Sequence, residues 1–80
     1  MPEKIMNKIL KHLETLKFEY IEAQNYRGSQ NRHLWSVLAK SKENGTWGSW
    51  EYNHSENKMK WARIGSRGYA ANYYSQRLKG

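Results

Sequence analysis

The first sixteen residues show a helical spacing of apolar side chains. Ile5, Ile9, Leu13 and Leu16 recur at steps of four, four and three, while lysines occupy the other side of the same helix. This pattern predicts an amphipathic helix over residues 3–16, with one apolar stripe that packs against the rest of the fold.

The segment after this helix alternates like a β-strand. Phe18 and Tyr20 fall on one side, with glutamates between and after them. Tyr20 and Ala23 would also continue the helical stripe, and Glu, Ala and Gln are good helix formers. We favour a strand because Phe18 and Ile21 fall outside the helical stripe, and the choice between strand and helix stays open for residues 17–25.

Three further alternating segments predict an antiparallel meander. Turn-forming residues separate them, and Asn-Gly is a strong hairpin dipeptide. The expected order is a polar connection at residues 25–31, a strand at 34–41, a turn at 43–45, a strand at 46–53, a turn at 54–57 and a strand at 58–64.

Alternation assigns the side chains of the meander to two faces. One face is apolar and is expected to meet the first helix: Trp35, Val37, Ala39, Trp50, Tyr52, Met59 and Trp61. The other face is expected to be open to solvent: Lys40, Lys42, Trp47, Ser49, Lys58 and Lys60. Leu34, Leu38 and Ile64 do not fit this division.

A second helix is predicted to close the chain. Glycines break the strand pattern at residues 65–68, and Ser66 is suited to cap a helix over residues 69–78. Ala70, Tyr74 and Leu78 form one stripe of that helix. The sequence therefore predicts an α+β fold in a single domain, residues 1–80, with an N-terminal amphipathic helix, an antiparallel sheet of three to four strands and a C-terminal helix.

Composition narrows the class of protein. The 80 residues include no Cys and no Asp, so neither a disulfide scaffold nor a thiolate-metal site is available. No run approaches the roughly 18 apolar residues of a membrane span, and the start of the chain does not resemble a signal peptide. We expect an intracellular, cytoplasmic protein that binds no membrane, metal or cofactor. His12, His33 and His54 suggest no catalytic arrangement, so we expect a protein that is not an enzyme.

The net charge of +7 is confined to one part of the chain. The first 26 residues are neutral, whereas the remainder has ten cations, three acids and eight of the eleven aromatic residues. Cations neutralise phosphates and aromatic rings stack on bases, so this concentration favours a nucleic-acid partner. A helix start flanked by arginines would also hold a phosphate. The predicted nucleic-acid-binding residues are Arg27, Arg32, Lys40, Lys42, Trp47, Lys58, Lys60, Arg63, Ser66 and Arg67.

Two nucleic-acid-binding families share residues with this region. Trp47-Gly48-Ser49-Trp50, then Trp61 and Gly65, then Tyr69-Ala70-Ala71-Asn72-Tyr73 resemble the three-stranded-sheet-plus-helix DNA-binding domain of plant ethylene-response factors, an architecture shared by phage integrase arm-binding domains. That resemblance implies that the sheet enters the major groove and places Trp47, Trp50, Lys58, Lys60 and Arg63 near DNA. Ser66, Arg67 and Ala70 more faintly resemble the start of the last helix in double-stranded-RNA-binding domains, which implies phosphate contacts there.

Two other functions stay open. Tyr, Trp and Arg also dominate protein interfaces, so the same surface would suit a small viral or bacterial inhibitor that docks on a partner protein. A pocket that binds a nucleotide through aromatic stacking and arginine is the third alternative. We favour non-enzymatic binding of nucleic acid through the phosphate backbone, and duplex DNA over RNA.

Overall fold

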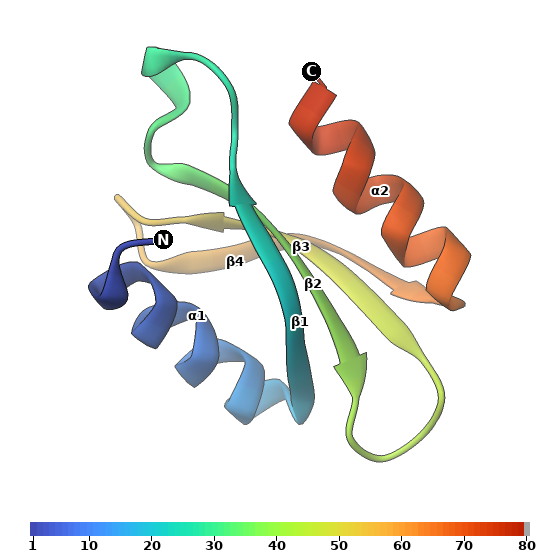
Figure 1. Ribbon diagram of the computed structural model, residues 1–80. Coiled ribbons are helices and arrows are strands. Elements are labelled where there is room, and N and C mark those ends of the chain that lie inside the picture. The colour runs from blue at the N-terminus through green and yellow to red at the C-terminus, as the bar shows by residue number, and fades with distance from the viewer. Residues whose placement is uncertain (80) are drawn as a thin grey trace.

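The computed structural model describes residues 1–79 and shows the expected α+β fold (Figure 1). Helix, four strands and helix follow one another along the chain, with a short 3₁₀ turn at Ser29–Asn31 between the first two strands. The elements are α1 (Glu3–Leu16), β1 (Phe18–Asn25), β2 (Leu34–Ser41), β3 (Trp47–Asn53), β4 (Lys58–Gly65) and α2 (Arg67–Lys79).

The boundary between α1 and β1 decides the segment that the sequence left open. Lys17 adopts the left-handed conformation with φ of 65°, and its backbone N–H donates to the carbonyl oxygen of Glu14. This is a common way for a helix to end, because it reverses the chain direction while using a terminal carbonyl. Phe18 then starts β1, so the strand prediction is confirmed.

The four strands form one antiparallel sheet in the order β1-β2-β3-β4, with α1 on one face and α2 on the other (Figure 1). Under α1, Ile9 and Leu13 pack on the apolar side chains predicted for that face. Trp35, Val37, Ala39, Trp50 and Tyr52 are all buried there. This core confirms most of the apolar face that alternation predicted.

The second face is not open to solvent at its centre, which corrects the sequence interpretation. α2 lies over β2, β3 and β4, and Ala70 and Tyr74 pack on Leu38. Ser36 and Ser49 are fully buried beneath it. The hydroxyl of Ser36 donates to the carbonyl oxygen of Tyr74 at 2.9 Å, so the buried polar groups of this interface are paired.

Trp61 is a second correction, because it lies outside the core and is 63% exposed. The pairing of β3 with β4 shifts register between Ser49 and Glu51, and Trp61 itself has φ of 57°. A bulge of this kind adds a residue to one strand and redirects its side chains. Simple alternation along β4 therefore fails at this position.

Candidate nucleic-acid interface

The N-terminus of α2 follows β4 after a single residue. Ser66 lies between them, and its hydroxyl oxygen accepts from the backbone N–H of Tyr69 at 3.2 Å, as predicted for a capping residue. The backbone N–H of Ala70 donates to the carbonyl oxygen of Ser66 and begins the helical ladder. The preceding N–H groups of Arg67 and Gly68 have no partner within the helix and point toward its N-terminal end.

Arg67 and Trp47 meet beside this helix start. The guanidinium carbon of Arg67 lies 5.5 Å from the centre of the Trp47 ring, within the range of a cation–π contact. Trp47 is paired with Lys40 on β2 and with Gly65 on β4. Lys40 is also the strand partner of Glu19 on β1, so its positive charge has an acidic neighbour.

Arg63 extends the same surface along β4. Its guanidinium carbon lies 5.1 Å from the centre of the Tyr73 ring, and Tyr73 contacts Tyr69 edge-to-face at 5.2 Å between ring centres. The Tyr69 ring packs on Gly65, where a β-carbon would lie only 3.0 Å from the ring. These contacts form two groups, Arg67 with Trp47 and Arg63 with Tyr73 and Tyr69. The groups meet at Gly65, which packs on Tyr69 and is the strand partner of Trp47. We call the five side chains together the Arg–aromatic patch: Trp47, Arg63, Arg67, Tyr69 and Tyr73.

Arg77 contacts Tyr73 of the patch, but its guanidinium forms hydrogen bonds within the fold. Its guanidinium donates to the hydroxyl of buried Ser49 and to the carbonyl oxygen of Trp61. Burial lowers the pKa of Arg77 from its ordinary value. Because both terminal nitrogens donate within the fold, Arg77 is a positioning residue for β4 and Tyr73.

Two tyrosine hydroxyls near α2 donate hydrogen bonds to glutamates of the sheet. The hydroxyl of Tyr74 donates to Glu22 at 2.6 Å, and the hydroxyl of Tyr26 donates to Glu51 at 3.0 Å. Burial, followed by the hydrogen bond to the carboxylate, raises the pKa of each tyrosine. These contacts engage two of the seven acids of the chain within the fold.

The remaining predicted cations do not join the Arg–aromatic patch. Lys58 and Lys60 pair with Asn53 and Glu51, at the opposite end of the sheet from Lys40. Lys60 forms the only ion pair found within residues 1–79, with Glu56, and this hydrogen bond lowers the pKa of the Glu56 carboxyl. Arg27 and Arg32 are exposed in the connection between β1 and β2, and Lys42 lies beside α1 in a hollow with Leu10 and Phe18.

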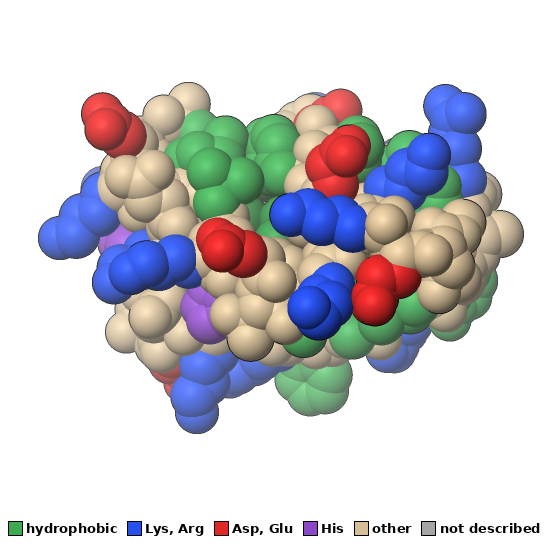
Figure 2. Space-filling model, turned by 90° about the horizontal axis from the view of Figure 1, so that it is seen from below, with side chains coloured by type: hydrophobic (Ala, Val, Ile, Leu, Met, Phe, Trp, Pro, Cys, Tyr) green, Lys and Arg blue, Asp and Glu red, His purple; other side chains and the backbone are tan. Residues whose placement is uncertain are grey.

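Figure 2 shows the charge distribution from below the view of Figure 1. Lys and Arg side chains are separated by acidic side chains on this side, and hydrophobic side chains are exposed between them. The positive charge therefore does not form one continuous surface here. What distinguishes the Arg–aromatic patch is the placement of its arginines on rings rather than the density of charge.

Sequence reasoning named Trp47, Arg63 and Arg67 as site residues but not Tyr69 and Tyr73, whose rings pack beside Gly65 and Arg63. Their spacing of four residues places them on one side of α2, next to the Ala70–Tyr74 stripe that packs on the sheet. This spacing was the available sequence signal. Their contacts with Gly65 and Arg63 depend on how α2 lies on β4, which the local pattern does not encode.

Comparison with known proteins gave no significant match, whether to a protein-family model, a curated protein or a solved structure. Within residues 1–79, no three His, Cys, Asp or Glu side chains come close enough together to hold a metal ion. No helix in that range is long and apolar enough to cross a membrane.

Proposed function

We propose that this protein is a non-enzymatic nucleic-acid-binding protein whose Arg–aromatic patch and α2 N-terminus contact the phosphate backbone. The observation that carries the proposal is the pair of cation–π contacts, Arg67 over Trp47 and Arg63 over Tyr73. Neither arginine has an ion-pair partner in the described part of the chain. A guanidinium has five N–H donors, and Arg63 uses one of them on the carbonyl oxygen of Ala62 at 3.1 Å. The remaining N–H groups of each arginine match the geometry of a phosphate.

The helix start adds donors to the same place. Ser66 uses its hydroxyl on Tyr69, which leaves the N–H groups of Arg67 and Gly68 for a ligand. The positive end of the helix dipole also favours an anion at this position. Backbone amides and one guanidinium can therefore bind one phosphate, and Arg63 is available for another.

The arginines over the aromatic rings favour a duplex ligand over a single strand. Single-stranded nucleic acid is usually bound by aromatic rings with open faces on which bases stack. Here guanidiniums lie over the rings of Trp47 and Tyr73, and Tyr69 presses on Gly65. Phosphates of a duplex are the ligand that suits this arrangement, and duplex DNA is the form we propose.

The surface proposed here is smaller than the one expected from the sequence. α2 covers the middle of the sheet face, so Lys40, Trp47, Arg63, Ser66 and Arg67 form the proposed interface with the two tyrosines. Lys58, Lys60, Arg27 and Arg32 lie toward the other end of the sheet, and we assign them no more than a general electrostatic contribution.

Fluorescence anisotropy with labelled duplex DNA, single-stranded DNA and duplex RNA, each about 20 nucleotides long, tests the proposal at about 50 and 200 mM salt. We expect duplex DNA to bind most tightly and its affinity to fall with added salt. An affinity for duplex DNA that does not change with salt, or no binding at low salt, would contradict the proposal. Binding to a partner protein through the same surface is the second candidate, and survival of that complex after nuclease treatment would favour it.

A further inference from the structure

A groove on the opposite side of the molecule from the Arg–aromatic patch holds a different combination of side chains. It runs between the C-terminal half of α1 and β4 and has a volume of about 580 Å³. Its apolar residues are Leu16 of α1, Trp50 of β3, and Met59, Trp61 and Ala62 of β4. Pockets of this size, with mostly apolar walls, are typical of binding sites.

Two of the apolar side chains that line the groove, Trp61 and Leu16, are exposed to solvent. Trp61 is 63% exposed and Leu16 is 44% exposed. The bulge in β4 places Trp61 there, since its φ of 57° departs from the strand geometry. Exposed Trp and Leu side chains that line one hollow form the kind of apolar surface that marks an interaction site.

Lysines surround this apolar surface, and no acidic residue lines it. A second hollow, lined by Lys8 and Lys11, shares His12, Thr15 and Asn57 with the groove, so the two lie side by side. His12 and Asn57 are hydrogen-bonded to each other at 3.0 Å. Lys58 and Lys60 line the β4 side. Lys60 has Glu56 as its partner, which leaves three lysines of this surface outside any ion pair in residues 1–79.

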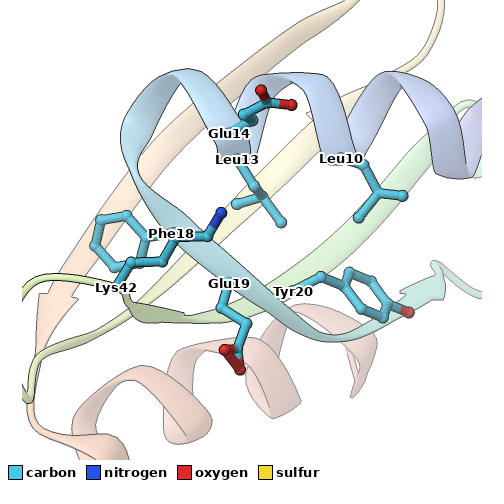
Figure 3. A pocket seen from close by; sticks show the side chains of 7 residues that line it. All are labelled: Leu10, Leu13, Glu14, Phe18, Glu19, Tyr20 and Lys42. Carbon is cyan, nitrogen blue, oxygen red and sulfur yellow. The ribbon is translucent and has the colours of Figure 1, made fainter.

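The other flank of α1 provides a comparison within the same protein. There Leu10 and Leu13 extend from α1 toward β1 (Figure 3), and Glu14, Phe18, Glu19, Tyr20 and Lys42 complete the lining. That side therefore carries charges of both signs, two acids and one lysine. Only the flank toward β4 combines exposed apolar side chains with charges of a single sign.

We infer that the groove between α1 and β4 is a docking site for an acidic segment of a partner protein that carries apolar side chains. The apolar anchors of the segment pack on Trp61 and Leu16, and its carboxylates lie near Lys8, Lys11 and Lys58. The bulge at Trp61 interrupts the free edge of β4, and Arg77 already occupies the Trp61 carbonyl oxygen. Recognition therefore proceeds through side chains rather than through addition of a regular strand.

Two other occupants fit the observations less well. A second copy joined by a symmetric interface would place the lysines of one groove against those of the other. A single strand of nucleic acid would use the lysines and stack a base on Trp61, but it would leave the aliphatic side chains of Leu16, Met59 and Ala62 without apolar partners. The inference is independent of the function proposed above, since no residue of the groove belongs to the Arg–aromatic patch.

Selection from a displayed library of random peptides of about 12 residues, with the full chain as bait, tests the inference. Selected peptides are then measured by anisotropy against the wild-type protein, Trp61→Ala, Lys58→Glu and Tyr69→Ala. We expect peptides rich in Asp, Glu and large apolar residues, with affinity reduced about tenfold or more by Trp61→Ala and about fivefold by Lys58→Glu. Tyr69→Ala, which changes an exposed aromatic residue outside the groove, is the control and should leave affinity unchanged.

Several results would overturn the inference. These are a failure to enrich any peptide, enrichment of neutral or basic peptides, and equal affinity for wild type and Trp61→Ala. Displacement of the peptide by duplex DNA, together with loss of DNA binding in Trp61→Ala, would assign the groove to nucleic acid. Since the function proposed above is tested on Arg63 and Arg67, either proposal can fail while the other stands.

Discussion

The guanidinium carbon of Arg67 lies 5.5 Å from the centre of the Trp47 ring, at the point where β3, β4 and α2 meet. Trp47 also packs against the core beneath α2. The core therefore holds the Trp47 indole in place, and Arg67 lies over this indole at the N-terminus of α2. The contact couples the position of a cation to the packing of the sheet.

Replacing Trp47 with leucine should weaken binding of duplex DNA about two- to fivefold. Leucine keeps an apolar body in the core but removes the ring face, and an exposed cation–π contact contributes about 0.5–1 kcal/mol. Anisotropy titrations check this, with circular dichroism to verify the fold. Arg67→Lys should show a similar loss, because lysine keeps the charge but not the planar stack. Unchanged affinity in both variants would show that the stack does not position Arg67 for binding.

Alkaline pH should destabilise the protein through Tyr26 and Tyr74. The pKa of each is raised in the folded state, so above about pH 10 the unfolded chain loses protons that the folded chain retains. The stabilisation is complete below the unfolded pKa and is lost as pH rises toward the folded pKa. Thermal unfolding between about pH 8 and 11 measures this effect.

The matching variant is Tyr26→Phe/Tyr74→Phe, which should lose less stability than the wild-type protein over the same pH range. Phenylalanine has no ionisable hydroxyl, so the folded and unfolded states no longer differ in proton binding at either position. Parallel curves for the variant and the wild-type protein would show that other groups cause the alkaline loss. Tyr52, whose pKa is raised by burial, remains in the variant and sets the residual slope.

Ser36→Ala should reduce the free energy of unfolding by about 1 kcal/mol, as is typical for loss of one hydrogen bond. The buried hydroxyl of Ser36 donates to the Tyr74 carbonyl oxygen, and it is a direct polar link between β2 and α2. Urea denaturation measures the change. Ser75→Ala, at an exposed position of α2, is the control and should stay within about 0.5 kcal/mol of the wild-type protein. Equal stability of the two variants would contradict a role for this link.

Gly48→Ala should cost about 1–3 kcal/mol of unfolding free energy, because a β-carbon at Gly48 would overlap the ring of Trp50. Trp50 is 3% exposed and packs in the core beneath α1, so the ring has little room to move. Gly45→Ala is the control, since a β-carbon there meets nothing within 4 Å. Similar stabilities in urea denaturation for both variants would mean that the core can absorb the extra carbon.

The three strands of the meander were predictable because turn residues separate them and most of their side chains alternate, whereas the segment of β1 also fitted a helical spacing. The predicted segment 34–41 coincides with β2, and Ile9 and Leu13 of α1 pack in the core as their spacing indicated. Leu16, predicted for the same stripe, is 44% exposed, because α1 ends there and β1 turns away from it. The site was harder to predict, since it depends on which element covers the second sheet face. Leu38 on a face otherwise occupied by lysines was the visible sign that the Ala70–Tyr74 stripe packs there.

Trp61 shows a different limit of sequence reasoning. Its place in the alternation of β4 predicted burial, but a bulge shifts the register within β3 and β4. A bulge adds one residue to one strand, and no change in composition accompanied it here. Trp61 of β4 and the lysines of α1 are far apart in the chain. They come close only because α1 packs on the sheet beside β4.

Two charge-matched double variants provide the decisive test of a phosphate site at the Arg–aromatic patch, with the salt-dependent affinity for duplex DNA as the measurement. Arg63→Gln/Arg67→Gln removes two cations from the patch, and Arg27→Gln/Arg32→Gln removes two exposed cations from the connection between β1 and β2. We expect the first variant to bind about tenfold or more weakly and to lose about two units of salt slope, while the second stays near the wild-type values. Equal losses in both variants would show that binding follows net charge alone and would contradict a phosphate site at the patch.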